Sequence, residues 1–119
     1  MLTKKNRLPK DRIEKVKGGG RYSHNSFFSV VYLSDQQTAS QFAFVLSKRI
    51  SKKATVRNKT KRLIAGSVRE LMANLKDGYW VVFLVKQTAL DQDKGVLAEA
   101  VENSFKEIGL FKENENTSS

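Results

Sequence analysis

The sequence of 119 residues contains no cysteine and a single histidine, His24. Without cysteine there can be no disulfide framework, no thiolate metal site and no cysteine nucleophile, so the hydrophobic core must carry the stability. His24 precedes an expected strand in a polar stretch, where an exposed loop residue is more typical than a general base or a metal ligand. The residues therefore suggest no cysteine- or histidine-based catalytic site.

Long hydrophobic stretches are also missing. The longest, residues 79–85, is far too short to cross a bilayer. The basic N-terminal residues are followed by Leu8 and Pro9 rather than by an apolar segment, so no secretory signal is visible. These absences predict a cytoplasmic protein with no membrane association.

Acidic residues are absent from Gln36 to Arg69, a segment that contributes nine positive charges. Residues 1–35 add a net +5 and residues 70–119 a net −4, which together give the formal +10. Like charges without counter-ions destabilise a compact state unless a ligand neutralises them. The basic segment therefore favours a nucleic-acid partner, with an acidic membrane surface or an acidic protein as alternatives.

The length predicts one domain over residues 1–112, followed by a disordered tail at 113–119. The hydrophobic periodicity predicts, in order, a helix over 9–17, a possible short strand at 20–23, strands over 26–33 and 41–46, a helix over 55–75, a strand over 79–85 and a helix from 96 to 108. Such an order is typical of an α+β sandwich with helices against one sheet.

Local signals add detail to this fold. We expect strands 26–33 and 41–46 to pair antiparallel, and strand 79–85, which is apolar throughout, to lie inside the sheet. Gly78 suits the left-handed position beyond the last turn of the long helix. Asp91 and Asp93 suit the N-terminus of the last helix better than a metal site, because no third carboxylate or histidine accompanies them.

The long helix is expected to be amphipathic. One side carries the apolar set that includes Val56, Ile64 and Leu71, Asn58 and Arg62 point away from it, and Arg57 and Lys61 lie at the boundary. Arginine and lysine suit phosphate oxygens, and an asparagine amide can reach a base or a 2′-hydroxyl. The candidate RNA-binding residues are Lys48, Arg49, Lys52, Lys53, Arg57, Asn58, Lys61, Arg62 and Arg69.

Aromatic residues in the first strands allow two interpretations. Phe27, Phe28, Phe42 and Phe44 could form a sheet platform on which single-stranded bases stack. Core packing is the more common use of alternating strand aromatics. Phe28 is the residue for which exposure in a cleft and burial in the core are about equally expected.

Residues 44–64 carry a motif of five positions: Ala54, Arg57, Asn58, Lys61 and Arg62. This pattern resembles the bacterial ribonuclease P protein family, over about residues 4–110. The resemblance implies a mixed sheet of about four strands, with the basic helix in a left-handed crossover between parallel strands. It also implies that the RNA subunit is catalytic and uses Mg²⁺, that the basic helix helps to organise metal ions near it, and that a monomeric protein binds this RNA and precursor tRNA. From the residues themselves we expect no catalytic residue and no metal ligand in the protein.

The same resemblance implies that the 5′ leader of precursor tRNA lies in a cleft between the sheet and the first helix. The candidate cleft residues are Ile13, Lys17, Phe28, Val31 and Tyr32. Family members often place aromatics where this chain has Ile13, Lys17 and Val31, and an arginine where it has Ala65. A structural RNA-binding protein of the ribosome, with no part in cleavage, is the alternative that composition leaves open.

Overall fold

The structure is a computed structural model that describes residues 2–112, so the tail predicted at 113–119 lies outside the described residues. Its helices and strands are α1 (Lys10–Gly19), β1 (Arg21–His24), β2 (Phe28–Leu33), β3 (Gln41–Val45), α2 (Ala54–Leu71), β4 (Trp80–Val85) and α3 (Lys94–Glu107). Short 3-10 helices at Lys4–Asn6, Met72–Asn74 and Gln87–Ala89 connect them. The order confirms the predicted α+β class, including the short first strand.

The four strands form one mixed sheet in the order β1-β2-β4-β3. Strands β1 and β2, and β2 and β4, pair antiparallel, whereas β3 pairs with β4 in parallel. The expected antiparallel pairing of β2 with β3 is therefore wrong. β4 separates the two because it is apolar on both faces and belongs at the centre of the sheet.

The connection between β2 and β3 passes β4 instead of turning back as a hairpin. The Gln36 N–H donates to the Gly78 carbonyl at 2.9 Å, and the Gly78 N–H donates to the Thr38 carbonyl at 2.9 Å. Gly78 has a φ of +88°, as the sequence predicted, but it lies in this loop contact rather than beyond the last turn of α2. The helix ends earlier, at Leu71, and continues as a 3-10 turn.

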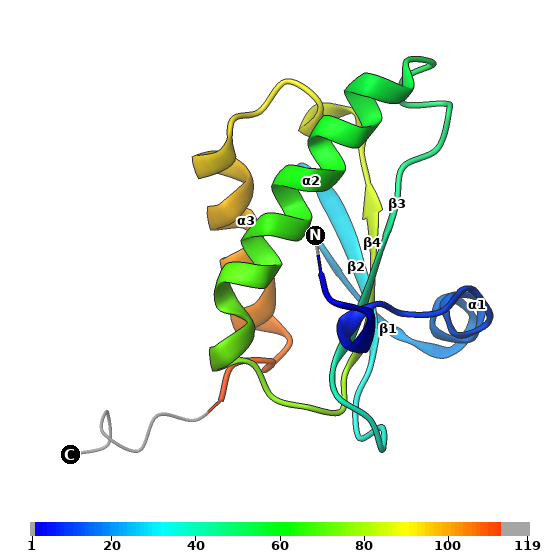
Figure 1. The fold of residues 1–119 in the computed structure, drawn as a ribbon, viewed down its shortest axis with the longest axis vertical. Coiled ribbons are helices and arrows are strands. Elements are labelled where there is room, and N and C mark those ends of the chain that lie inside the picture. Colours follow the sequence, from blue (N-terminus) through cyan, green and yellow to red (C-terminus); the bar gives the residue numbers. More distant parts are fainter. Residues whose placement is uncertain (1, 113–119) are drawn as a thin grey trace.

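Helix α2 joins the parallel strands β3 and β4. In Figure 1 both strands run upward, α2 lies on the near side and β4 lies to the left of β3. This arrangement makes the crossover left-handed, against the usual right-handed rule. The basic helix thus occupies the crossover that the resemblance implies.

The two faces of the sheet are covered unequally. Helices α2 and α3 cover one face, and α1 crosses the other (Figure 1). Because successive strand residues point to opposite faces, Phe28 and Phe83 join a core with α2 and α3, whereas Val31 and Val82 join a smaller cluster under α1. We call these the α2/α3 face and the α1 face.

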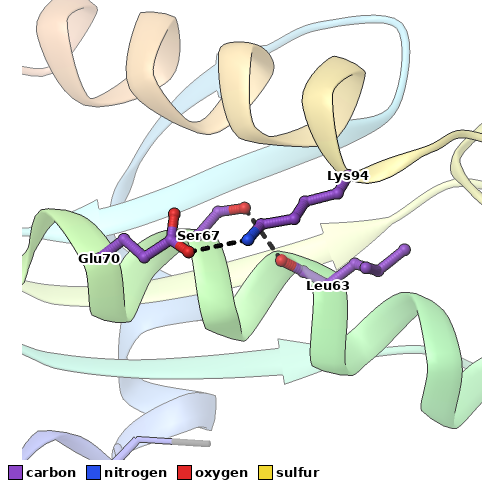
Figure 2. Close-up of polar contacts among 4 residues, drawn as sticks. All are labelled: Leu63, Ser67, Glu70 and Lys94. Carbon is purple, nitrogen blue, oxygen red and sulfur yellow. Dashed lines mark hydrogen bonds and ion pairs between the residues drawn. The ribbon is translucent and has the colours of Figure 1, made fainter.

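The contact between α2 and α3 includes an exposed ion pair. Lys94 Nζ lies 2.9 Å from Glu70 Oε1, and the Ser67 hydroxyl donates to the Leu63 carbonyl within α2 (Figure 2). Asp93 caps α3 by accepting a hydrogen bond from the Val96 N–H at 3.0 Å, which confirms its expected place at the helix N-terminus.

Candidate nucleic-acid interface

The structure brings eight of the nine candidate RNA-binding residues together at the start of α2. Asn58 and Arg62 are exposed on the helix, and Arg57 and Lys61 are half-buried at its sides. The exposed residues of the preceding loop complete the set, which we call the basic surface: Lys48, Arg49, Lys52, Lys53, Arg57, Asn58, Lys61 and Arg62. Arg69 is also exposed, but it lies about 16 Å further along the helix axis than Asn58.

Helix α2 is held by its opposite side. The side that faces the sheet and α3 is buried and consists of Thr60, Ile64, Ser67 and Val68. Asn58 and Arg62 therefore point outward. This division follows the helical spacing of the sequence.

Two hydrogen bonds order the side chains of the basic surface. Arg57 Nη1 donates to the Ser51 carbonyl at 2.7 Å, which ties the loop to the first turn of the helix. Arg62 Nε donates to the Asn58 carbonyl at 3.4 Å, so the guanidinium lies along the helix. Within residues 2–112 the single ion pair joins Lys94 to Glu70, so no carboxylate lies within 4 Å of these cations. Their remaining N–H donors are available to an anion.

A pocket of about 210 Å³ connects the basic surface with α1. Lys61 and Ala65 of α2 line it together with Arg7, Ile13 of α1 and Ala43 of β3. Ala65 is completely buried there. One candidate RNA-binding residue and one candidate cleft residue, Lys61 and Ile13, thus share a cavity.

The five candidate cleft residues do not share one surface. Ile13 is half-buried and Lys17 exposed on α1, and Val31 is completely buried beneath α1. Phe28 and Tyr32 lie on the α2/α3 face, because they alternate with Val31 along β2.

The position of these two aromatics on the α2/α3 face corrects their assignment to the cleft. Phe28 is 0% exposed with its ring 5.0 Å from that of Phe83, and Tyr32 stacks on Tyr79 with ring centroids 6.0 Å apart. Phe27, Phe42 and Phe44 pack into the same core. The four phenylalanines therefore serve packing, not an exposed platform.

Sequence reasoning missed a polar and aromatic cluster where α1 meets the sheet. The Arg12 Cζ lies 4.5 Å from the centroid of the Trp80 ring, and Arg12 Nη1 donates to Gln41 Oε1 at 2.7 Å. Lys15 Nζ lies 5.6 Å from the same ring, and Trp80 Nε1 donates to the Thr38 hydroxyl at 2.9 Å. Arg12 and Lys15 are three residues apart, so the sequence could have placed both cations on one face of α1. It could not have shown that Trp80 lies beneath them, because Trp80 is distant in sequence.

Another missed feature is an exposed pair of rings on β1. Tyr22 is 51% exposed and stacks on His24 with ring centroids 5.7 Å apart and planes at 20°. Both side chains lie on the α1 face, because Tyr22 is the cross-strand partner of Val31 and His24 that of Ser29. His24 is thus exposed, as the sequence predicted, although it belongs to a strand.

One tyrosine at the rim of the α2/α3 face has a perturbed acidity. The pKa of Tyr79 is raised above its ordinary value, mainly because the phenol is partly removed from water. The nearby Tyr32 and Asp35 raise it further. Its hydroxyl lies 3.3 Å from the Ile108 carbonyl and 3.2 Å from that of Gly109, at the end of α3.

Neither a metal cluster nor a membrane segment is found in the described part of the chain. No group of three or more histidine, aspartate or glutamate side chains within residues 2–112 could hold a metal ion. Among the same residues, no helix combines the length and the apolar character that a membrane crossing requires.

Residues 2–109 match the family model for Ribonuclease P. A ribonuclease P protein component from Caldanaerobacter subterraneus subsp. tengcongensis is 32% identical over 102 residues, covering 86% of this chain and 87% of the relative. One from Symbiobacterium thermophilum is 34% identical over 86 residues, covering 71% and 74%. These similarities favour a ribonuclease P role over the ribosomal alternative.

Solved structures share the fold. The RNase P protein from Staphylococcus aureus has a TM-score of 0.80 at 17% identity, covering 92% of this chain and all of that one. The protein from Thermotoga maritima has a TM-score of 0.76 at 22% identity, covering 86% and 96%. With the sequence matches above, they lead to one assignment: the chain belongs to the ribonuclease P protein family, whose members are subunits of the endoribonuclease ribonuclease P with a role in tRNA 5′-end processing.

Proposed function

We propose that the chain binds the catalytic RNA of ribonuclease P through the basic surface and holds the 5′ leader of precursor tRNA along the α1 face, which promotes endonucleolytic removal of the leader. The observation that carries this proposal is the basic surface itself: eight polar or cationic residues, gathered by one loop and the first turns of one helix, with no carboxylate partner within residues 2–112. Ribose-phosphate supplies the missing negative charge.

The chemistry of the individual residues supports RNA over other anions. The guanidinium of Arg62 can bind a phosphate in a bidentate manner, and Lys52 and Lys61 add mobile charges. The exposed Asn58 amide can donate to or accept from a base edge or a 2′-hydroxyl. Arg57 has one N–H committed to the loop and can use the others on the ligand.

The path of the leader follows from the pocket between Lys61 and Ile13. That pocket joins the basic surface to α1 and β3, so RNA bound at α2 can continue onto the α1 face. Of the candidate cleft residues, Ile13 and Lys17 suit contact with the leader, and Val31 supports α1 from below. Phe28 and Tyr32 have no part in this path because they face α2 and α3.

Catalysis is assigned to the RNA subunit, with Mg²⁺ as the metal of its active site. The residues of the basic surface do not fit a Mg²⁺ site, since carboxylate oxygens are its usual protein ligands and Gln36 to Arg69 contains none. We assign no reaction step to the ion on the protein. The protein acts as one copy per particle in the cytoplasm and contributes binding and positioning.

The test is reconstitution of precursor-tRNA cleavage with ribonuclease P RNA at low Mg²⁺, where a contribution to positioning is most visible. Wild-type protein is expected to restore cleavage, and the affinity for the RNA to fall with salt at a log–log slope of about −3.5 to −4.5 if about five cations contact phosphates. Arg62→Ala should weaken RNA binding and reduce the steepness of that slope by about 1.

Lys106→Ala is the matched control, because it removes one exposed cation from the last turn of α3, outside the basic surface. It should bind like wild type. Equal behaviour of Arg62→Ala, Arg57→Ala and Lys106→Ala would contradict the assignment of the basic surface. A wild-type protein that leaves cleavage unchanged would contradict the whole proposal.

A further inference from the structure

Tyr22 and His24 form the exposed aromatic pair of the α1 face. With 51% of its surface accessible, Tyr22 is the more exposed of the two large hydrophobic residues in the described chain that are exposed; the other is Val96. Tyr22 belongs to neither hydrophobic cluster. Packing therefore gives no reason for an aromatic side chain at this position.

Each of the two rings makes a hydrogen bond to a neighbouring element. The Tyr22 hydroxyl donates to the Lys17 carbonyl at 3.3 Å, at the last turns of α1. The His24 Nδ1 lies 2.7 Å from the Ser29 hydroxyl on the adjacent strand. Each ring is thus anchored at its polar edge, and their nearly parallel stacking leaves an ordered aromatic surface before any ligand arrives.

The sheet register connects these rings to the basic surface. His24 pairs with Ser29, Ser29 with Leu84 and Leu84 with Val45, so the four residues form one row across all four strands. Leu84 and Val45 are only half-buried. The row spans about 14 Å between the outer strands.

The two ends of this row differ in chemistry. At one end, Val45 is the last residue of β3, and the chain continues from it into the loop with Lys48 and Arg49. At the other end lie His24 and Tyr22. A single strand that leaves the basic surface and follows the α1 face therefore meets cations first and aromatic rings last.

We propose that Tyr22 and His24 form a stacking platform for an unpaired nucleobase of the 5′ leader. Every base has a π-face, so stacking on aromatic side chains captures single strands with little dependence on sequence. The platform suits RNA whose bases are unpaired, because bases within a duplex are stacked on each other and not available. This inference rests on the proposed function, since it assigns the ligand of that function to two further residues.

The experiment measures the affinity of the reconstituted complex of protein and ribonuclease P RNA for precursor tRNAs with a leader of one nucleotide or of eight. Tyr22→Ala should weaken binding of the long-leader substrate by about 5- to 150-fold, the range for loss of one stacked base. Binding of the one-nucleotide substrate and of ribonuclease P RNA should stay unchanged. Tyr22→Phe keeps the ring and should retain most of the affinity.

His24→Ala provides a second variant. It should lower the affinity for the long-leader substrate by less than Tyr22→Ala does, and it should leave the affinity for the one-nucleotide substrate unchanged. Val96→Ala is the matched control, because Val96 is the other exposed large hydrophobic residue and lies on α3. Leaders with 4-thiouridine at successive positions should crosslink to residues 21–24 from one position only. Circular dichroism would check that each variant is folded.

The outcomes separate this inference from the proposed function. If wild type favours the long leader and Tyr22→Ala does so equally, the platform is refuted while the proposed function stands. If Tyr22→Ala weakens both substrates alike, the pair serves another purpose, such as contact with a protein or with the tRNA body, and the platform is again refuted. If wild type binds ribonuclease P RNA but does not distinguish leader lengths, both the platform and the leader-binding part of the proposed function fail.

Discussion

The two faces of the sheet differ in how they are packed and in how much of each is covered by helices. On the α2/α3 face, Phe83 lies within 6.0 Å, ring to ring, of Phe28, Phe44 and Phe105, and two helices cover them. On the α1 face, one helix of ten residues covers part of a smaller cluster, in which Trp80 is the single aromatic residue and aliphatic side chains make up the rest. One face thus provides most of the stability, while the other keeps an accessible surface. The comparison teaches that side-chain alternation alone can give one face of a small sheet to the main core and leave the other face partly accessible.

The largest expected effect is a loss of stability, and it should differ between two adjacent residues of β4 that point to opposite faces. Phe83 and Val82 are both completely buried and point to opposite faces. Phe83→Ala should lower the free energy of unfolding by about 3–5 kcal/mol, because it removes the centre of the aromatic core. Val82→Ala should cost about 1.5–3 kcal/mol. Chemical denaturation measures both, and a larger loss for Val82→Ala would reverse our view of which face carries the stability.

An intermediate effect is expected where α1 meets the sheet. A Cβ on Gly20 would lie 2.6 Å from the Val16 carbonyl oxygen and 2.8 Å from that of Tyr32. Because backbone atoms cannot move aside easily, Gly20→Ala should destabilise the protein by about 1–3 kcal/mol and increase amide exchange in α1. Gly18→Ala is the control: apart from its chain neighbours and the backbone of its own helix, nothing lies within 4 Å of the new Cβ.

Since Gly18 lies within α1, its replacement by alanine should stabilise the helix by about 0.5–1 kcal/mol. Hydrogen exchange followed by mass spectrometry resolves α1 from the other elements. If both glycine variants left α1 protected as in wild type, the close contact of its C-terminus with β2 would be contradicted.

The smallest expected effect lies at the rim of the α2/α3 face and depends on pH. The raised pKa of Tyr79 means that the unfolded chain loses this proton first as the pH increases. The stability contributed by the neutral phenol is therefore complete below the unfolded pKa, near 10, and falls as the pH rises above it. Tyr79→Phe removes this titration.

At pH 8, Tyr79→Phe should cost about 0.5–1.5 kcal/mol through the lost hydrogen bond to the end of α3. Between pH 10 and 11 the free energy of unfolding should fall faster for the wild type than for Tyr79→Phe. The difference between the two proteins should therefore shrink as the pH rises. Urea denaturation at each pH measures the difference. A difference that stays constant over this range would show that Tyr79 titrates alike in both states.

Much of the fold was predictable because local patterns decide it. The unbroken apolar run of β4 placed it inside the sheet, and the spacing of Ile64 and Arg62 on α2 defined the buried and polar sides. Strand order was not predictable in this way. Neighbours in sequence favour hairpins, whereas here β4 pairs with both β2 and β3. The contacts of Gln36 and Thr38 with Gly78 hold the connection that passes β4 before β3 begins.

The candidate site was predictable where its residues are consecutive and not where they come from separate elements. One helix and its loop hold the basic surface, so the sequence alone indicated its composition. Alternation along β2 already separated Phe28 and Tyr32 from Val31, but the sequence does not say which set α1 covers. The contact of Arg12 with Trp80 joins residues far apart in sequence, which no local pattern reveals.

The central position of β4 has a consequence for how the protein assembles during synthesis. Of its four strands, β4 emerges last from the ribosome, yet both β2 and β3 pair with it. Until residues 80–85 are available, the nascent chain can form the β1–β2 hairpin and isolated helices, but β3 has no strand to bind. The acid-free segment that ends at Arg69 is therefore complete before the sheet that will hold its helix can close.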